Sequence, residues 1–375
     1  MRGKNQPKRP IAVLGAGSWG TTFAKVLVDG GADVTMWARR PELAREITEA
    51  RRNSDYLPGI NLPRTLRATS NLPDAVAGAG LVFLCVPSQS LRGNLPAVAK
   101  VLSDDAVVIS LMKGIERSSG LRMSQVLAAG LGVDAERIAV ASGPNLALEI
   151  AREQPTAVVV SSESIETAQA VALAARNKYF RSFVNSDVIG TEFGGVLKNL
   201  IAVAVGIVDG VGYGENTKAS IITRGLAEMT DFAVAYGAKA ETLSGLAGLG
   251  DLIATCESPL SRNNTAGRLL GQGYSFADVV KQMDQTAEGL ASIAPVLTLA
   301  KARGVEMPIV QQVGQVLAGT LKPRDLAPHL TTEPDEPRGE RTIHGGETGS
   351  GTAVRRAFQR AFHQLRNGGR SSRGA

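Results

Sequence analysis

Histidine is scarce in this sequence, and its scarcity excludes several kinds of active site. The 375 residues contain only three histidines, His329, His344 and His363, and all of them follow residue 328. A histidine zinc site, a Ser-His-Asp triad and a histidine general base therefore lack an imidazole in the body of the chain. No tyrosine is followed by a lysine four residues later, so a Tyr-x-x-x-Lys pair is absent as well. An acid–base group must then be a lysine, an aspartate, a glutamate or a cysteine.

Cysteines are also few, and no segment is typical of export or of a membrane span. The two cysteines are Cys85 and Cys256. Polar and basic residues follow Met1, without the apolar segment of a signal peptide. The apolar run over residues 195–210 is too short and too rich in glycine to span a bilayer. We therefore expect a cytoplasmic protein with ordinary buried thiols and no stable membrane insertion.

The net charge of +6 is confined to the two ends of the chain. Residues 1–9 carry four basic side chains and no acid, and residues 331–375 carry eight arginines against five acids. The body between them is left with a net charge of −1. A basic body of the kind that binds nucleic acid is thus missing, and we expect no nucleic-acid partner. Residues 331–350 are rich in proline, glycine, threonine and acids, so the C-terminal segment is predicted to be a disordered basic tail.

The first half of the chain alternates short apolar runs with segments of helical periodicity. The runs are rich in β-branched residues and nearly continuous, as in a parallel sheet that is covered on both faces. This alternation predicts an α/β fold, with a Rossmann-type doubly wound sheet over residues 10–190. The expected strands are Ile11–Gly15, Asp33–Trp37, Leu81–Val86, Ala106–Ser110, Arg137–Ser142 and Thr156–Ser161.

After about Ser186 the apolar runs give way to helical patterns that are punctuated by glycine. These patterns predict an all-α C-terminal domain over residues 191–330, with "SGLAGLGD" (244–251) as a loop. Residues 1–9 then form a basic N-terminal tail and residues 331–375 the C-terminal one. The expected helices are Thr191–Val208, Lys218–Tyr236, Arg262–Leu270, Ser275–Met283, Leu290–Arg303 and Pro308–Leu317.

The segment "GAGSWG" places glycines at Gly15, Gly17 and Gly20. It follows an expected strand directly and opens an expected helix over Thr21–Asp29, which is the context that gives the G-x-G-x-x-G pattern its meaning. The first glycine permits the tight turn, the second lets the backbone approach a pyrophosphate, and the third lets helix and strand pack closely. The N–H groups of the helix N-terminus complete an anion site. The pattern predicts dinucleotide binding.

The end of the second expected strand bears on the choice of cofactor. NAD sites usually carry an acid there, which bonds the ribose 2′-hydroxyl. This strand ends "TMWARRPE", with Arg39 and Arg40 in the place of the acid. A guanidinium suits a 2′-phosphate, so we expect NADP(H) to be preferred, with NAD(H) as a second cofactor. The alternative is that both arginines only cap a surface loop.

One lysine stands out because its surroundings are apolar. The run "GVLKNLIAVAVGIVDG" (195–210) contains Lys198 and no other charge before Asp209. Burying an ammonium is costly unless it is paired or loses its proton. On a helix, its neighbours would be mostly small residues, including Gly194 and Gly195, which would leave a groove beside it. Lys198 therefore either extends to solvent or occupies a site where its proton matters.

Several short motifs occur together in this chain. They are "YLPGINLP" (56–63), "VPSQS" (86–90), "SLMKGIE" (110–116), "SGPNLALEIA" (142–151), "GGVLKNLIAVAVGIVDG" (194–210), "GLGDLIATCESPLSRNN" (248–264) and "TAEGL" (286–290). With these motifs in order over residues 10–326, the sequence strongly resembles bacterial-type NAD(P)-dependent glycerol-3-phosphate dehydrogenase. The resemblance implies interconversion of sn-glycerol 3-phosphate and dihydroxyacetone phosphate, which supplies the backbone of glycerophospholipids. It also implies a homodimer.

The resemblance implies roles for individual residues. Lys198 would be the general base, and Lys113 would contact both substrate and cofactor. The residues implied to bind substrate are Lys113, Gly143, Asn145, Lys198, Asp251, Ser261, Arg262 and Asn263. Those assigned to the cofactor, including the glycine loop and the two arginines, are Gly15, Gly17, Ser18, Trp19, Gly20, Arg39, Arg40, Tyr56, Lys113, Ala147, Arg262, Thr286 and Glu288. No metal site is expected.

The chemistry of the residues agrees with these roles. Oxidising a secondary alcohol needs a base for the hydroxyl proton, and an apolar setting would favour the neutral amine of Lys198. Ser261 is a suitable N-cap for a helix beginning at Arg262, so backbone N–H groups and a guanidinium would converge on a phosphate. Asp251 is expected either to orient Lys198 or a substrate hydroxyl, or only to cap the next helix.

Two positions depart from the family pattern, and two other functions remain open. Asn145 stands where many relatives have a hydroxyl residue, and Asn264 where many have arginine. A sibling β-hydroxyacid-type dehydrogenase would share the architecture and a lysine base, but "SRNN" (261–264) argues against a substrate without phosphate. A non-catalytic NADP-sensing protein would have no reason to keep both Lys113 and Lys198 beside small residues.

Overall fold

The structure, a computed structural model, describes residues 9–283 and 288–326. These residues lie in one compact unit, Met1–Thr331. The predictions for residues 1–8 and 331–375, and for Thr286, fall outside the described residues.

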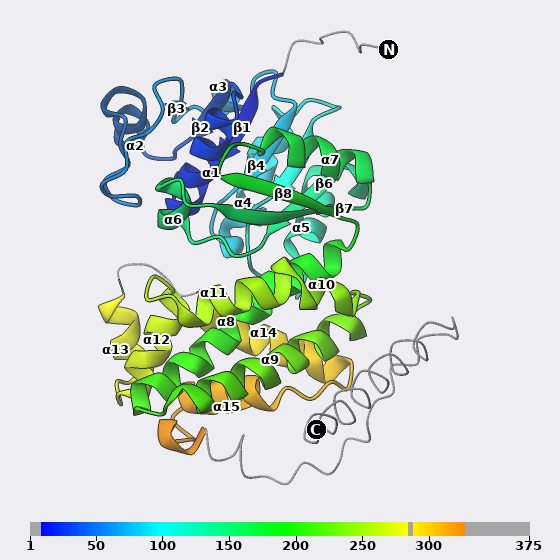
Figure 1. Ribbon diagram of the computed structural model, residues 1–375. Helices are drawn as coiled ribbons and strands as arrows, with labels where there is room; N and C mark the ends of the chain where they lie inside the picture. Colours follow the sequence, from blue (N-terminus) through cyan, green and yellow to red (C-terminus); the bar gives the residue numbers. More distant parts are fainter. Residues whose placement is uncertain (1–8, 284–287, 327–375) are drawn as a thin grey trace, which may run out of the picture. The chain divides into compact units, whose positions relative to one another are not determined.

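Eight strands form a single sheet in the order β3-β2-β1-β4-β5-β6-β7-β8 (Figure 1). All neighbouring strands are parallel except β6 and β7, which are antiparallel, so the expected parallel sheet is wrong at this one junction. The six expected strands are present, and the sequence missed the two edge strands, β3 and β8. The strands are β1 (Ile11–Leu14), β2 (Val34–Trp37), β3 (Arg67–Thr69), β4 (Leu81–Leu84), β5 (Val107–Ser110), β6 (Ile138–Ser142), β7 (Thr156–Ser162) and β8 (Phe180–Asn185).

Helices cover both faces of this sheet, as expected. Alternate residues of a central strand enter two different cores, as Val13 and Leu14 of β1 do. One core includes side chains from α1, α2, α6 and α7, and the other includes side chains from α3, α4 and α5. These helices are α1 (Ser18–Asp29), α2 (Pro41–Arg45), α3 (Leu72–Val76), α4 (Leu91–Ala99), α5 (Met123–Leu131), α6 (Ala147–Ala151) and α7 (Ile165–Ala174).

From Val188 onward the described chain contains helices and no further strands, so the predicted α/β fold with a helical C-terminal part is confirmed. The change from strands to helices falls between Asn185 and Val188, close to the boundary predicted at residue 190. The predicted loop 244–251 is instead mostly a π-helix, Leu246–Gly250, and a short helix that the sequence missed follows it. The helices are α8 (Val188–Val211), α9 (Glu215–Ala235), α10 (Ala240–Ser244), α11 (Asp251–Glu257), α12 (Arg262–Gly271), α13 (Phe276–Gln282), α14 (Glu288–Ala302) and α15 (Pro308–Leu317).

Helix α8 is almost completely buried, and α12 packs closely against it. A Cβ added at Gly206 of α8 would lie 2.2 Å from the backbone oxygen of Asn264. One added at Gly267 of α12 would lie 2.2 Å from the backbone oxygen of Val203. Small residues four apart on both helices, at 206 and 210 and at 267 and 271, thus let the two backbones approach.

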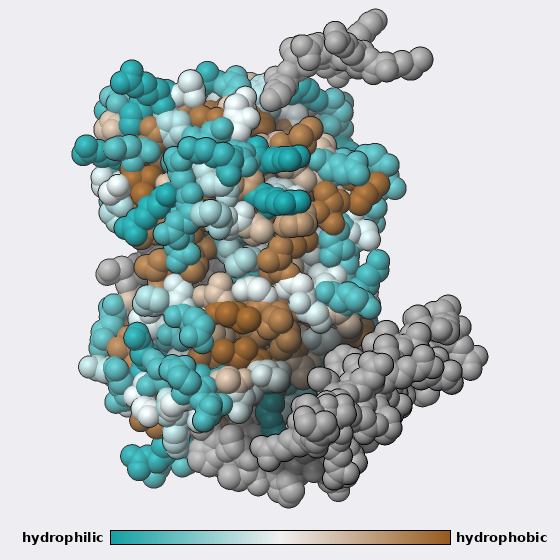
Figure 2. All heavy atoms as spheres, viewed as in Figure 1, coloured by the Kyte–Doolittle hydropathy of each residue, from teal (hydrophilic) through white to brown (hydrophobic). Residues whose placement is uncertain are grey.

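Among the described residues, α8 is also the one helix long and apolar enough, by length and composition, to cross a membrane. The expectation about length applies to the run 195–210 alone, because the helix that contains it spans 24 residues, Val188–Val211. Most of the helix is buried within the protein, and core helices pass the same test. On the face shown in Figure 2, hydrophilic side chains predominate and apolar ones gather in patches.

Candidate active site

The three glycines of the G-x-G-x-x-G loop differ in their surroundings. Gly15 has a φ of +117°, and a Cβ on it would lie 2.3 Å from the backbone oxygen of Cys85. A Cβ on Gly20 would lie 2.1 Å from the oxygen of Gly15, so α1 meets the turn there without a side chain between them. A Cβ on Gly17 would meet nothing within 4 Å. The first and third glycines therefore serve packing, while the second leaves open space beside the backbone for a ligand.

A neighbouring segment between α2 and β3 holds this loop in place. Asn53 is fully buried, and its Nδ2 donates to the oxygen of Ala16 at 2.9 Å and to Oγ1 of Thr21 at 2.8 Å. The hydroxyl of Ser18 donates to the oxygen of Tyr56 at 2.6 Å. Two residues implied to bind cofactor, Ser18 and Tyr56, are thus brought together. The role of Asn53 was not anticipated from the sequence.

Some of the buried polar atoms without hydrogen-bond partners belong to residues near the predicted ligand site. Within the described residues, Nε1 of Trp19, both amide atoms of Asn145 and the hydroxyl of Ser142 are buried without a hydrogen-bond partner. Buried polar atoms are nearly always hydrogen-bonded in proteins. Trp19 lies in the first turn of α1, and Ser142 and Asn145 lie at and just after the carboxyl end of β6. Ala147 is tied to α1 because its oxygen accepts from Thr22 at 3.2 Å. These groups fit a dinucleotide with a substrate beside it.

The two arginines after β2 differ in their partners. Nη2 of Arg40 donates to Oδ2 of Asp55 at 2.6 Å, and its guanidinium lies 5.7 Å from the centre of the Tyr56 ring. The hydrogen bond with Asp55 raises the pKa of Arg40 above its ordinary value. Arg39 is exposed and has no ion-pair partner among the residues that the structure describes. Both side chains are therefore accessible beside the glycine loop.

The carboxylate of Asp251 joins the two lysines of the predicted site. Nζ of Lys198 donates to Oδ1 of Asp251 at 2.9 Å, and Nζ of Lys113 donates to Oδ2 at 2.6 Å. Lys113 follows β5, Lys198 lies on α8, and Asp251 begins α11, so three distant parts of the chain meet here. The side chain of Asp251 is 2% exposed and that of Lys198 is 9% exposed. Asp251 therefore contacts Lys198, as one of its expected roles requires.

Close contacts surround Lys198 where the sequence predicted an apolar groove. Its Nζ also donates to Oγ1 of Thr255 at 2.6 Å, one turn into α11. A Cβ on Gly194 would lie 2.3 Å from the backbone oxygen of Ala247, and one on Gly195 would lie 3.2 Å from the side chain of the other lysine. The small residues therefore admit other parts of the protein, which fill the expected groove. The expectation of an apolar setting is wrong, because a carboxylate and a hydroxyl hold the amine.

A second ion pair fixes α8 against the loop that carries Lys113. Glu192 accepts from the backbone N–H of Ser124 at 2.8 Å and from its hydroxyl at 2.6 Å, and it pairs with Arg122. Arg122 caps α5, which follows Lys113 along the chain. Gly143, with a φ of +147°, completes this side of the site, because its oxygen accepts from Nζ of Lys113 at 3.0 Å.

Cys256 follows Thr255 but is unsuited to acid–base chemistry. Burial raises the pKa of its thiol to about 12, against a smaller opposing effect of the Lys198 charge. The thiolate is the reactive form of cysteine, and a thiol with such a pKa remains protonated at neutral pH. The cysteine is therefore unsuited to be the base, and Lys113 and Lys198 remain as candidates beside Asp251.

The "SRNN" segment begins α12. Oγ of Ser261 accepts from the N–H of Asn264 at 3.2 Å, which confirms the predicted N-cap. Arg262 is exposed in the first turn. Asn264, where many relatives have arginine, is buried and donates from Nδ2 to the oxygen of Cys256 at 2.8 Å. Its amide therefore forms a hydrogen bond inside the protein.

Asn263 links this helix start to the neighbourhood of Lys198 and to α14. Its Nδ2 donates to Oδ1 of Asn199, the residue after Lys198, at 2.9 Å. Its Oδ1 accepts from the N–H of Gly289 at 3.0 Å. Glu288 is the first residue of α14. The Asn199 contact was missed because nothing in the sequence pairs two asparagines so far apart.

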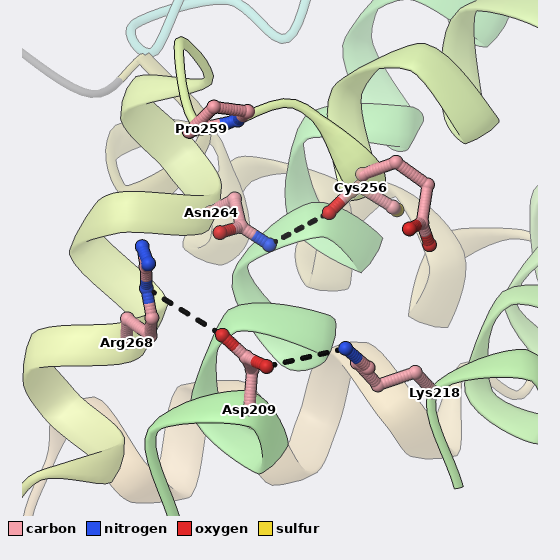
Figure 3. A pocket seen from close by; sticks show the side chains of 7 residues that line it. Asp209, Lys218, Cys256, Pro259, Asn264 and Arg268 are labelled. Atoms are coloured by element: carbon pink, nitrogen blue, oxygen red, sulfur yellow. Dashed lines mark hydrogen bonds and ion pairs between the residues drawn. The ribbon is translucent and has the colours of Figure 1, made fainter. Parts of the chain in front are cut away.

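A small pocket of about 90 Å³ lies next to "SRNN" and is distinct from the predicted site (Figure 3). Within it, Asp209 pairs with Lys218 at 3.2 Å and with Arg268 at 3.5 Å. These ion pairs satisfy charges that would otherwise face a ligand. The pocket is lined by Asp209, Lys218, Cys256, Glu257, Pro259, Asn264 and Arg268.

Known proteins resemble this chain along nearly all of its described length. Residues 10–168 match the family "NAD-dependent glycerol-3-phosphate dehydrogenase N-terminus", and residues 187–328 match its C-terminal counterpart. A glycerol-3-phosphate dehydrogenase [NAD(P)+] of Leifsonia xyli is 74% identical over 366 residues, which cover 96% of this chain and 99% of the relative. One of Frankia casuarinae is 51% identical over 329 residues, covering 88% of this chain and 98% of the relative.

A solved structure agrees in fold as well as in sequence. The crystal structure of glycerol-3-phosphate dehydrogenase from Coxiella burnetii has a TM-score of 0.82 and 36% identity, covering 87% of this chain and 99% of that one. These matches favour the resemblance found in the sequence over the β-hydroxyacid-type alternative. The chain belongs to the NAD(P)-dependent glycerol-3-phosphate dehydrogenase family.

Proposed function

We propose that this oxidoreductase interconverts sn-glycerol 3-phosphate and dihydroxyacetone phosphate with Lys198 as the general base. The observation that carries the proposal is the Lys198–Asp251–Lys113 cluster, in which one buried carboxylate orients two lysines. The family to which the chain belongs supports the same reaction.

The residues divide the chemistry among them. When bound, the nicotinamide exchanges a hydride with C2 of the substrate. In the direction of reduction, Lys198, which is paired with Asp251, donates a proton to the C2 oxygen. In the direction of oxidation, it accepts the C2 hydroxyl proton after it has released its own proton to solvent. Asp251 and Thr255 hold its Nζ at hydrogen-bond distance, so the amine is positioned before substrate arrives. Lys113 supplies a second donor at the reacting end.

The phosphate end of the substrate is assigned to the start of α12. Free N–H groups at a helix N-terminus favour a phosphate, and Arg262 provides a guanidinium beside them. Ser261 and Asn263 hold this turn in place through the N-cap and the bond to Asn199. Gly143 and Asn145 are assigned to the substrate as well.

The cofactor is assigned to the glycine loop and the adjoining segments. We propose that NADP(H) is preferred through Arg39 and Arg40, and that NAD(H) is also used. The open side of the glycine loop and the buried Nε1 atom of a tryptophan support this placement. The other residues assigned to the cofactor are Ser18, Trp19, Tyr56, Lys113, Ala147, Arg262, Thr286 and Glu288.

The cellular setting is part of the proposal. We propose a cytoplasmic enzyme that supplies the backbone of glycerophospholipids and acts as a homodimer, with two domains that divide near residue 190. The lack of net positive charge in the body of the chain supports a small-molecule substrate over nucleic acid.

The test is NADPH oxidation by the purified full chain with dihydroxyacetone phosphate. Dihydroxyacetone, which lacks the phosphate, is the matched control, and a short β-keto acid tests the sibling activity. Turnover with the phosphorylated ketone alone supports the proposal. Turnover with the β-keto acid would show a different substrate class, and NADPH binding without any turnover would show a sensing protein.

A further inference from the structure

The ion pair between Arg40 and Asp55 lies where the ribose of a bound dinucleotide is expected. The N–H of Gly15 donates to the oxygen of Trp37 at 3.0 Å, so the glycine loop and the end of β2 are adjacent. In dinucleotide-binding folds, the group just after the second strand contacts the ribose 2′ position. An acid is missing from that position here, but Asp55 brings a carboxylate from another segment to the guanidinium of Arg40.

Asp55 combines an anchored backbone with an accessible side chain. Asn53, two residues earlier, is fully buried and bonds to the glycine loop. Tyr56, one residue later, accepts through its backbone oxygen from the start of α1. The side chains of Arg40 and Asp55 are 49% and 54% exposed, so a ligand can reach both. The protein thus fixes the chain on either side of Asp55 and leaves the carboxylate open.

We infer that Asp55 is a specificity-determining residue, which narrows the preference for NADP(H) over NAD(H) by competing for Arg40. The inference rests on the proposed use of Arg39 and Arg40 for a 2′-phosphate. A 2′-phosphate must displace Asp55 from the guanidinium and tolerate its negative charge nearby, whereas a 2′-hydroxyl can donate to the carboxylate. The guanidinium of Arg40 therefore suits the 2′-phosphate of NADP(H), and the carboxylate of Asp55 suits the 2′-hydroxyl of NAD(H).

The size of the effect follows from the exposure of the pair. Exposed ion pairs contribute little, so releasing Arg40 should change the affinity for NADPH by about five-fold at most. Raised salt should reduce this change, because it screens the charges involved.

The test is Asp55→Asn, with the dissociation constants of NADPH and NADH measured by calorimetry in the absence of substrate. The asparagine keeps the size of the side chain and a carbonyl acceptor but removes the charge. We expect NADPH to bind up to about five-fold more tightly and NADH to bind nearly as before. In an Arg40→Ala background, the same substitution should have a smaller selective effect, since no guanidinium remains to be released and only the repulsion between Asp55 and the 2′-phosphate is removed.

Asp33→Asn is the matched control. Asp33 pairs with Arg67 at 2.5 Å and both side chains are about half exposed, but Asp33 lies at the opposite end of β2. This variant should leave the ratio of the two dissociation constants unchanged. The inference would be overturned if Asp55→Asn left the ratio of the NADPH and NADH dissociation constants unchanged. It would also be overturned if Asp33→Asn shifted this ratio by the same amount as Asp55→Asn.

A second variant separates the failure of this inference from the failure of the proposed cofactor preference. If Arg39→Ala/Arg40→Ala does not weaken NADPH selectively, the proposed preference is wrong. If it does so while Asp55→Asn leaves the ratio unchanged, the preference stands and only the role of Asp55 is wrong.

Discussion

The two halves of the predicted site hold their charges in different ways. In the catalytic half, the carboxylate of Asp251 is almost completely buried between Lys113 and Lys198. In the cofactor half, Arg40 and Asp55 form a pair whose side chains are about half exposed. Removing one partner of a buried pair leaves an uncompensated charge and is costly, whereas an exposed pair contributes little. The first arrangement suits a fixed catalytic geometry, and the second suits a contact that a ligand rearranges.

The largest expected effect concerns the buried cluster. Lys198→Met should abolish turnover while NADPH still binds, because methionine removes the amine but keeps the length of the side chain, and Lys113 remains to pair with Asp251. Loss of a general base typically costs on the order of 10² to 10⁴ in rate. Steady-state kinetics and cofactor binding of the purified variant check this prediction.

Arg262→Ala provides the contrast to that variant. It removes a proposed phosphate contact, so its main effect should be a higher KM for the substrate. A normally folded Lys198→Met protein with near-native turnover would show that the lysine serves only as a structural partner of Asp251 and Thr255.

Gly206 and Gly17 allow a second comparison, between an effect on the stability of the protein and an effect on cofactor binding. Gly206→Ala forces a Cβ against the backbone of α12, and such overpacking typically costs about 1–3 kcal/mol. Gly17 has an extended backbone and open space around it, so Gly17→Ala should cost about 1 kcal/mol or less in stability. Its methyl group would instead project toward the expected pyrophosphate and weaken NADPH binding.

Thermal unfolding and NADPH titration of both variants check this pair. We expect a lower Tm with retained NADPH binding in Gly206→Ala. In Gly17→Ala we expect a nearly unchanged Tm and weaker NADPH binding. A Gly17→Ala protein that binds NADPH normally would show that the pyrophosphate does not approach this turn.

Much of the fold could be predicted because its central strands are nearly continuous apolar runs. The missed strands are edge strands: β3 has only three residues, and β8 leaves Phe183 43% exposed. Neither therefore carries the continuous apolar run of a buried strand. The antiparallel direction of β7 was also missed, because a buried run has the same pattern in either direction.

The site was predictable where a local motif carried it and not where distant residues meet. Lys113 and Asp251 are 138 positions apart, and only the fold brings them together. Asn53 lies in a polar stretch that resembles an ordinary turn, so its buried bonds to the glycine loop had no local signal. Glu192 was overlooked because one acid near the start of a long apolar helix does not reveal its partners.

A smaller effect is expected from the exposed arginines. Arg39→Ala/Arg40→Ala should raise the KM for NADPH and leave that for NADH nearly unchanged, because only NADPH carries the 2′-phosphate. Parallel kinetics with both cofactors check this expectation. Equal losses with the two cofactors would mean that the arginines support the loop itself.

The smallest effect is expected when residues 331–375 are removed. No predicted site residue lies there, the family match ends at residue 328, and the compact unit that contains both halves of the site ends at Thr331. The Frankia relative aligns over 98% of its own length but only 88% of this chain, whereas the Leifsonia relative aligns over 96% of this chain. Truncation after Leu330 should therefore leave turnover within a few-fold of the full chain, measured at equal concentrations of folded protein. A soluble, folded truncate that binds NADPH but does not turn over would show that the C-terminal segment contributes to the catalytic half after all.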